Sequence, residues 1–169
     1  QIEKDGFFID EKIENLLSSD TKSSIAKSTG LATILLSDAF SRLDPDVVLV
    51  LGDRFETHAA ATAAMLMNIP IAHIHGGEIT EGAIDEKIRH SITKMSSLHF
   101  TSIEEYRDRV IQMGEPSNTV FSVGAPGIDN IVNMNLLSKD ELEDELEWKF
   151  NGTTALFTFH SETLSTVDT

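Results

Sequence analysis

Two patterns of hydrophobic and polar positions alternate along the chain. Short continuous runs of apolar residues are typical of strands buried on both faces of a parallel sheet, and the clearest is the run at 47–51. Longer stretches with apolar residues three and four positions apart are typical of helices. Their alternation predicts an α/β fold with a Rossmann-like, doubly wound parallel sheet. The expected strands are 47–51, 71–75, 98–100, 119–123 and 154–159, and the expected helices are 10–17, 23–43, 55–67, 84–95, 102–113 and one from about 128.

Two local signals refine these elements. Ser102 and Glu105 have the spacing of a capping box, which predicts that the serine begins the helix after it. The acidic stretch at 140–148 is expected to form a solvated linker helix in which Leu142 packs against Leu146. We therefore expect an N-terminal domain over 1–137, a linker region over 138–153 and the start of a second domain over 154–169.

Composition and charge restrict the classes of function. The chain of 169 residues is 40% hydrophobic, as ordinary globular domains are, and its 13 Lys and Arg stand against 28 Asp and Glu, for a net charge of −15. This average charge repels nucleic acids and anionic membranes, whereas a small anion can still bind at helix N-termini and single arginines. We therefore expect neither a nucleic-acid nor a membrane partner.

The absence of Cys excludes disulfides, thiolate catalysis and Cys-based metal sites, and it fits a cytoplasmic protein. The longest apolar run, near 59–67, is interrupted by Thr62 and is too short to span a membrane. No signal peptide opens the sequence. Because the chain begins without Met and ends without a helix stop, we expect it to be a piece of a longer protein.

Polar and glycine-rich groups follow four of the expected strands. In an open parallel sheet a ligand binds outside the carboxyl ends of the strands, so these groups predict one site at a single edge of the sheet. They are Asp53-Arg54-Phe55-Glu56, His73-Ile74-His75-Gly76-Gly77-Glu78, Gly124-Ala125-Pro126-Gly127 and His160-Ser161-Glu162.

The groups after the first of these strands admit two interpretations each. Asp53 either caps the helix behind it or supplies a carboxylate to the site. Arg54 at the start of a helix opposes the helix dipole, which favours a nearby anion over a plain surface charge.

His73 and His75 lie on one face of the second strand because they are two residues apart. Their spacing suits a metal clip, but a third ligand is not evident, so we favour hydrogen-bonding or acid–base roles and expect no metal. A buried structural role fits His73 better than His75, which ends the strand. Gly76 and Gly77 either allow a ligand to approach the backbone closely or form a plain turn.

The next helix opens with residues spaced for ion pairs. Asp85 with Arg89, and Glu86 with His90, are four residues apart, which predicts pairs on a solvated helix face. Asp85 also follows a loop at the strand ends, from which its carboxylate can enter the site. We expect Asp85 to meet His75 there, so that the two side chains handle protons as one unit.

Four segments of the chain together resemble the UDP-N-acetylglucosamine 2-epimerases, and among them the hydrolysing bacterial branch that makes N-acetylmannosamine for sialic acid. The resemblance runs from about Ile9 to His160, and its most specific part is the string HGGE followed by DExIRH. The segments are 51–56, 72–82, 84–94 and 123–129.

This resemblance implies a GT-B architecture, in which two Rossmann-like domains hold a UDP-sugar in the cleft between them. The chain would carry most of the first domain, without its first strand and Arg-bearing loop, and the first strand of the second. The resemblance implies UDP-N-acetylglucosamine or a related UDP-sugar as the partner, and no metal or redox cofactor. We also expect a homo-oligomer.

The resemblance assigns roles to individual positions. It places a catalytic aspartate at Asp53, an acid–base residue at His75, where other members carry Glu, and a further carboxylate at Asp85. Arg54 and His160 would hold the diphosphate. The remaining positions expected to bind substrate are His73, Gly76, Gly77, Glu78 and Arg89.

The implied reaction removes the C2 proton of UDP-N-acetylglucosamine, expels UDP and adds water, which requires a base and anion stabilisation together. The same motifs fit a UDP-2,4-diacetamido-trideoxyhexose used for legionaminic-type sugars. A catalytically silent sugar-nucleotide-binding module would also account for the motifs. So would a metal-dependent hydrolase built on His73 and His75 with Asp53 and Asp85.

Overall fold

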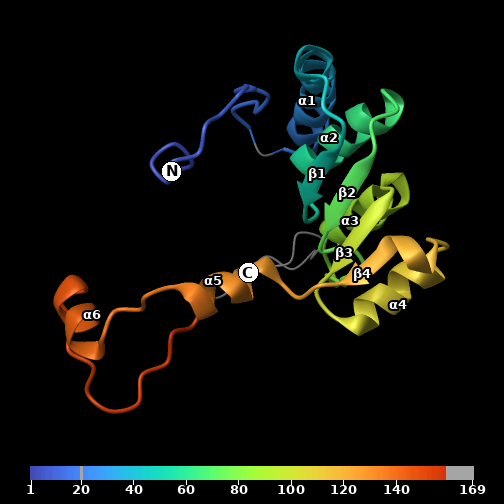
Figure 1. Ribbon diagram of the computed structural model, residues 1–169. Helices are drawn as coiled ribbons and strands as arrows, with labels where there is room; N and C mark the ends of the chain where they lie inside the picture. The colour runs from blue at the N-terminus through green and yellow to red at the C-terminus, as the bar shows by residue number, and fades with distance from the viewer. Residues whose placement is uncertain (20, 159–169) are drawn as a thin grey trace.

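The computed structural model describes residues 1–19 and 21–158, and a parallel sheet forms its centre (Figure 1). The register aligns Val50 with His73 and His73 with His99, so these side chains share one face of the sheet. In the described residues the sheet has four strands in the order β1-β2-β3-β4. They are β1 (Val48–Leu51), β2 (Ile71–Ile74), β3 (Leu98–Thr101) and β4 (Val120–Ser122).

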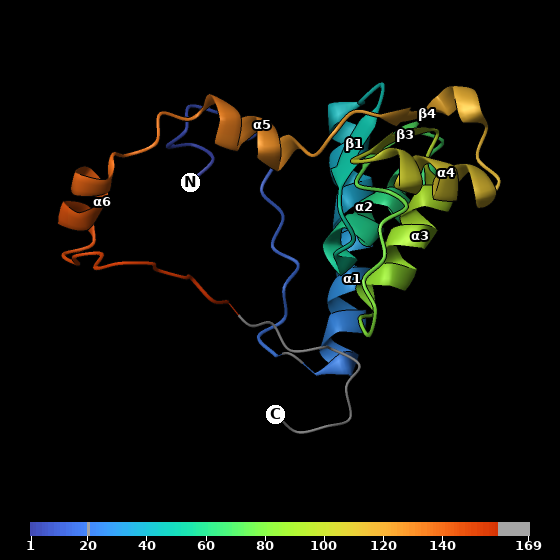
Figure 2. The same cartoon turned by 90° about the horizontal axis from the view of Figure 1, so that it is seen from below.

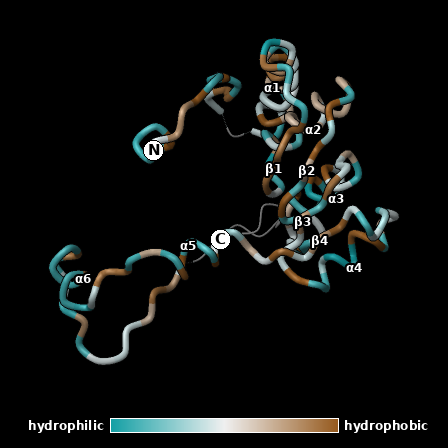
Figure 3. The backbone as a smooth tube through the Cα atoms, in the orientation of Figure 1, coloured by the Kyte–Doolittle hydropathy of each residue, from teal (hydrophilic) through white to brown (hydrophobic). Residues whose placement is uncertain are grey.

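Helices pack against one face of this sheet. Because parallel strands are joined by right-handed crossovers, a strand order that runs in one direction places every connecting helix on the same side. Figure 2 shows the helices on this side of the strands, and the strands are among the hydrophobic stretches of Figure 3. The connecting helices are α2 (Phe55–Leu66), α3 (Asp85–Met95) and α4 (Glu104–Gln112), and α1 (Lys22–Leu43), which precedes β1, packs against α2.

The opposite face of the sheet is apolar, and along β1 it is exposed in the described residues. Val48 and Val50 of β1 face the helices and are buried, whereas Leu49 and Leu51 alternate with them and are 63% and 57% exposed. The α/β class and the Rossmann-like parallel sheet are confirmed. The described strands form one half of a doubly wound sheet. The strand order does not reverse within these four strands.

An alanine-rich helix fills the space between the sheet and the outer helix α1. Ala59, Ala61, Ala63 and Ala64 of α2 are all buried, and their small side chains let α2 approach its neighbours closely. The core consists of Val48, Val50, Ala61, Ala64, Ile71 and Ile92. No helix among residues 1–19 and 21–158 has the length and apolar character needed to cross a membrane.

Two further helices lie away from the sheet in both views (Figures 1 and 2). α5 spans Pro126–Asn133 and α6 spans Lys139–Glu145, and a short 3-10 turn, η1 (Ser117–Thr119), precedes β4. Leu142 lies in α6 and Leu146 is its C-cap residue, and their side chains are 37% and 55% exposed, so the packing expected between them stays a prediction. The buried residue of α6 is Glu143, which pairs with Lys139 and Lys149.

Three expected local structures are not found. Residues 10–17 form no helix, because a segment of this length needs packing to stay helical and its Leu16 is 75% exposed. Residues 154–158 form no strand and have no pairing partner among the described residues, while 159–160 lie outside them. Ser102 caps no helix: α4 begins at Glu104, and the Ser102 hydroxyl is bonded elsewhere.

The turn after β2 requires glycine at position 77. Gly77 has a φ of +80°, and a Cβ there would overlap the backbone oxygen of Tyr106 and lie 2.9 Å from Cγ2 of Val110. Arg109 of α4 also donates a hydrogen bond to the Gly77 carbonyl. The turn is therefore pressed against α4, which fixes the path of the chain between the strand end and the following loop.

We predict that Gly77→Ala destabilises the fold more than Gly52→Ala does. Gly52 has the same φ of +80° but open space around its Cα, so alanine there costs only the left-handed conformation, about 1–2 kcal/mol. Gly77→Ala adds overpacking against α4, about 1–3 kcal/mol more. Urea unfolding of the two variants measures the difference, and equal losses would contradict the close approach.

Candidate active site at the strand ends

A buried ion pair joins the end of β1 to α3. The Arg89 guanidinium donates through Nη2 to Oδ2 of Asp53 and through Nη1 to the Thr80 hydroxyl at 3.2 Å. The Arg89 side chain is only 8% exposed. The helix-cap interpretation of Asp53 is wrong, because Arg54 occupies the N-cap position of α2. The expected partner of Arg89 was Asp85, and the structure pairs it with Asp53 instead.

Asp85 begins α3 close to the same charges. Partial burial, and then the negative charge of Asp53, raise the pKa of Asp85 above its usual range, although Arg54 and Arg89 oppose the shift. A raised pKa makes this carboxyl a better proton carrier near neutral pH than an ordinary aspartate. The ion pair of Asp53 with Arg89 thus lies near enough to Asp85 to influence its charge, as does Arg54.

Arg54 has an anion beside it, as its position predicts, but the anion belongs to its own helix. Its Nε and Nη2 donate to the two carboxylate oxygens of Glu56 at 3.1 and 3.2 Å. This hydrogen-bonded pair raises the pKa of Arg54. The Arg54 side chain remains 72% exposed, so a solvent-borne anion can still reach it.

His73 is a core residue beneath the site. Its side chain is fully buried, with Nε2 at 2.8 Å from the Gly52 carbonyl and Nδ1 at 3.2 Å from the Thr93 hydroxyl. Burial lowers the pKa of His73 to about 4, so the ring is neutral at pH 7. The expectation that His73 binds substrate is not met, because both ring nitrogens are engaged inside the protein.

His75 follows the end of β2 in a left-handed conformation, with a φ of +67°. Its backbone N–H donates to the Phe100 carbonyl at 2.9 Å, which ties it to β3. Its Nδ1 lies 2.6 Å from Oε1 of Glu78, and the Ser102 hydroxyl donates to that same oxygen at 2.9 Å.

The expected contact between His75 and Asp85 is absent from the described residues. His75 pairs with Glu78, whereas the charged neighbours of Asp85 are Asp53, Arg54 and Arg89. The predicted pair of Glu86 with His90 does form, with Oε1 and Nε2 at 3.8 Å.

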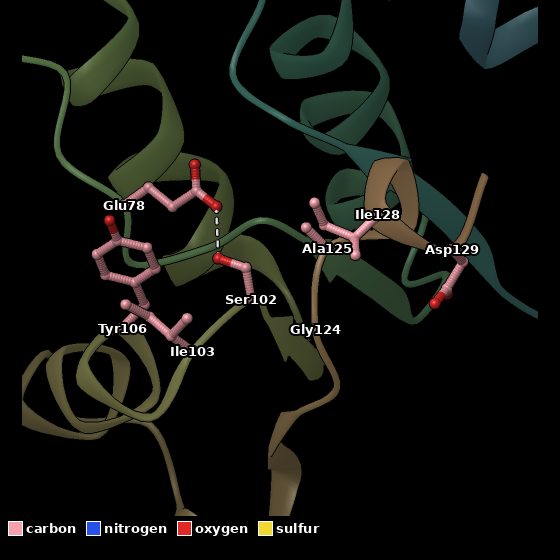
Figure 4. Close-up of a pocket in the computed structure, with 8 residues that line it drawn as sticks. All are labelled: Glu78, Ser102, Ile103, Tyr106, Gly124, Ala125, Ile128 and Asp129. Carbon is pink, nitrogen blue, oxygen red and sulfur yellow. Dashed lines mark hydrogen bonds between the residues drawn. The ribbon is translucent and has the colours of Figure 1, made fainter. Parts of the chain in front are cut away.

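A cavity of about 500 Å³ opens beside Glu78 (Figure 4). Figure 4 shows the Glu78 and Ser102 side chains joined by their hydrogen bond, with Tyr106 close by. Ser102 was missed as a site residue, although it follows β3 directly and the strand-end rule could have found it. The lining residues are Glu78, Ser102, Ile103, Tyr106, Gly124, Ala125, Ile128 and Asp129.

Gly76 lies against buried groups of the core. A Cβ at Gly76 would lie 3.1 Å from the Thr93 hydroxyl and 3.2 Å from Nδ1 of His73.

Within residues 1–19 and 21–158, no three His, Asp or Glu side chains are grouped so as to hold a metal ion. Because the His73 ring is engaged, the metal clip suggested by its spacing from His75 does not form there. His160 lies outside the described residues.

Together these features define an α/β domain with carboxylates, arginines and a histidine at the carboxyl edge of its parallel sheet. The family model of UDP-N-acetylglucosamine 2-epimerase matches residues 1–168, and the chain belongs to this family.

Several relatives are similar over most of the chain. The GDP/UDP-N,N'-diacetylbacillosamine 2-epimerase (hydrolyzing) of Campylobacter jejuni is 48% identical over all 169 residues, which match 44% of that protein. The polysialic acid biosynthesis protein P7 of Escherichia coli is 44% identical over 98% of this chain and 42% of its own. The chain therefore spans less than half the length of these relatives.

Solved structures share the fold. The UDP-GlcNAc 2-epimerase of Neisseria meningitidis bound to UDP-GlcNAc matches with a TM-score of 0.63 and 28% identity, over 68% of this chain and 32% of that one. The Methanocaldococcus jannaschii enzyme in complex with UDP-GlcNAc and UDP matches with a TM-score of 0.62 and 27% identity, over 68% and 31%. The GT-B fold of these enzymes is the architecture to which this sheet belongs.

We predict that His73 makes stability fall in mild acid. The pKa of His73 is about 4 in the folded chain, against about 6.5 in an unfolded one. The unfolded state therefore binds the proton first, and stability is lost as the pH falls from 6.5 towards 4, by about 3 kcal/mol in total.

Comparison of the wild type with His73→Gln tests this assignment. The variant loses packing at every pH, but its free energy of unfolding should fall less steeply between pH 6.5 and 4.5, by about 1.4 kcal/mol per pH unit. Urea unfolding at several pH values measures the slope. An unchanged slope in the variant would show that His73 is not the responsible group.

Proposed function

We propose that the complete polypeptide carrying this sequence is a hydrolysing 2-epimerase of a UDP-linked 2-acetamido sugar. The observation that carries the proposal is the buried ion pair of Asp53 with Arg89 at the strand ends, whose charges act on the partly buried carboxyl of Asp85. Family membership over residues 1–168 supports the same chemistry.

In the first step the C2–H proton passes to an enzyme base. Its electron pair forms a C1–C2 double bond while the C1–O bond to UDP breaks, and the electrons of that bond leave on the diphosphate. Asp53, Asp85 and His75 are the groups proposed to handle the proton. Arg54, whose guanidinium is exposed, is proposed to stabilise the leaving diphosphate. His160 is proposed to assist it.

In the second step water adds to the double bond. Its oxygen bonds to C1 and a proton is delivered to C2 on the face opposite to the one it left, which inverts C2 and releases a free sugar. Asp85, whose pKa is raised by partial burial and by the charge of Asp53, is proposed as the group that returns the proton.

The proposed substrate is a UDP-2,4-diacetamido-trideoxyhexose. Relatives named for UDP-N,N'-diacetylbacillosamine are 48% and 44% identical to this chain, whereas the Neisseria meningitidis serogroup B relative named for UDP-N-acetylglucosamine is 34% identical. UDP-N-acetylglucosamine, which would give N-acetylmannosamine, is the second candidate, supported by the 44% identity to a polysialic acid biosynthesis protein.

We predict that Asp53→Asn in the complete polypeptide lowers the rate of UDP release by about 10²–10⁴-fold, because the amide cannot act as a base. Asp46→Asn is the matched control, since Asp46 lies exposed before the amino end of β1 and should be silent. Circular dichroism and UDP binding check that the loss is chemical, because Asp53 also neutralises Arg89. A variant that keeps more than about a tenth of wild-type turnover would contradict the role of Asp53.

We predict that the product is a free sugar that acquires deuterium at C2 when the reaction runs in D₂O. Proton removal to an exchangeable enzyme group requires this label. We expect kcat/KM for the diacetamido substrate to exceed that for UDP-N-acetylglucosamine by roughly tenfold or more. Mass spectrometry of the products reads the label, and rates of UDP release from each substrate give the kcat/KM ratio. An unlabelled C2 would exclude the elimination route.

A further inference from the structure

We propose that Glu78, held by Ser102, is a positioning residue that orients the His75 ring and fixes its tautomer. The proposal rests on the proposed function, in which His75 handles a proton. It replaces the expectations that Glu78 binds substrate and that Asp85 is the partner of His75.

The three side chains form one continuous hydrogen-bonded chain. Oε1 of Glu78 receives the Ser102 hydroxyl at 2.9 Å and lies 2.6 Å from Nδ1 of His75. The His75 and Glu78 side chains are 22% and 25% exposed, so the contact is partly shielded from water. A partly buried hydrogen bond to a charged acceptor is stronger than an exposed one.

The backbone around the three residues is fixed on several sides. His75 is bonded through its N–H to Phe100 of β3, and Ser102 directly follows the end of that same strand. The turn between His75 and Glu78 is pressed onto α4 at Gly77. His75 itself adopts a left-handed backbone conformation, which a residue with a Cβ rarely adopts. In this conformation its ring lies beside Glu78.

The chemistry of the contact determines the tautomer. An ionised carboxylate only accepts hydrogen bonds, so Nδ1 of His75 must carry the hydrogen. The lone pair of the neutral ring is then on Nε2, the nitrogen left to exchange a proton with a substrate. A carboxylate that orients a histidine in this way is a recurrent arrangement in acid–base catalysis.

The other titratable groups nearby do not compete for the contact between His75 and Glu78. His73 is buried on the helix-covered face and is engaged with Gly52 and Thr93. Arg89 is bound to Asp53 and Thr80. Glu78 is thus the one carboxylate in the described residues that is bonded to the His75 ring.

The test combines spectroscopy with kinetics on the complete polypeptide, labelled with ¹⁵N-histidine. The wild-type His75 ring should show Nδ1 protonated and Nε2 unprotonated in its neutral form. In Glu78→Gln the amide can donate as well as accept, so a mixture of tautomers is expected. Glu81→Gln is the matched control, an exposed carboxylate in the same loop, and should leave the spectrum unchanged.

Kinetics separate positioning from substrate binding. Glu78→Gln should lower kcat for UDP release by about 10²-fold with KM changed by less than about threefold. Ser102→Ala should lower kcat by about 2- to 10-fold, the effect of one lost hydrogen bond. It also provides a milder variant if Glu78→Gln does not fold. A rise in KM at constant kcat would overturn the positioning role in favour of substrate binding.

The outcomes for the two proposals are distinguishable. A wild-type ring protonated on Nε2, or a Glu78→Gln variant with wild-type kcat, would overturn the positioning role while UDP release continues to support the epimerase. A protein with the expected tautomer that releases no UDP from either UDP-sugar would overturn the proposed function, and the catalytic positioning role with it.

Discussion

The buried imidazole of His73 holds together the strand ends that carry the site. Its Nε2 bonds to the Gly52 carbonyl directly before Asp53, and its Nδ1 contacts the Thr93 hydroxyl of α3. The neutral ring donates from Nε2, so its Nδ1 accepts from this hydroxyl, whose oxygen also lies 3.1 Å from the Arg89 carbonyl. One neutral ring thereby links β1, β2 and α3 at the point where Asp53 and Arg89 meet. A buried polar group without a partner would be costly, so the folded chain keeps these groups within hydrogen-bond distance of one another.

Close packing around the His73 ring also fixes the turn that carries His75 and Glu78. Gly76 leaves room for the His73 ring and the Thr93 hydroxyl, and Gly77 leaves room for the backbone of α4. With the turn held on both sides, His75 emerges in a left-handed conformation with its ring beside Glu78. The two glycines thus shape the site through the protein's own packing.

The sequence predicted where polar groups gather better than it predicted which of them pair. Asp53, His75 and Asp85 follow from the rule that parallel strands present their carboxyl ends at one edge. The pairs Asp53 with Arg89 and His75 with Glu78 depend on helix rotation and turn geometry, which spacing does not encode. The same limit explains residues 10–17 and 154–158, whose patterns are regular but which lack the packing partners that a helix or strand requires.

The carboxylates of the site stand in three different electrostatic environments. Asp53 faces a buried guanidinium, Glu78 faces an imidazole and a hydroxyl, and Asp85 has no bonded cation among the described residues. Burial and the charge of Asp53 accordingly raise the pKa of Asp85. The proposed reaction removes and returns a proton, and it needs groups whose environments differ in this way, because identical carboxylates would titrate together. The fold creates that difference by placing each carboxylate at the end of a different strand or helix.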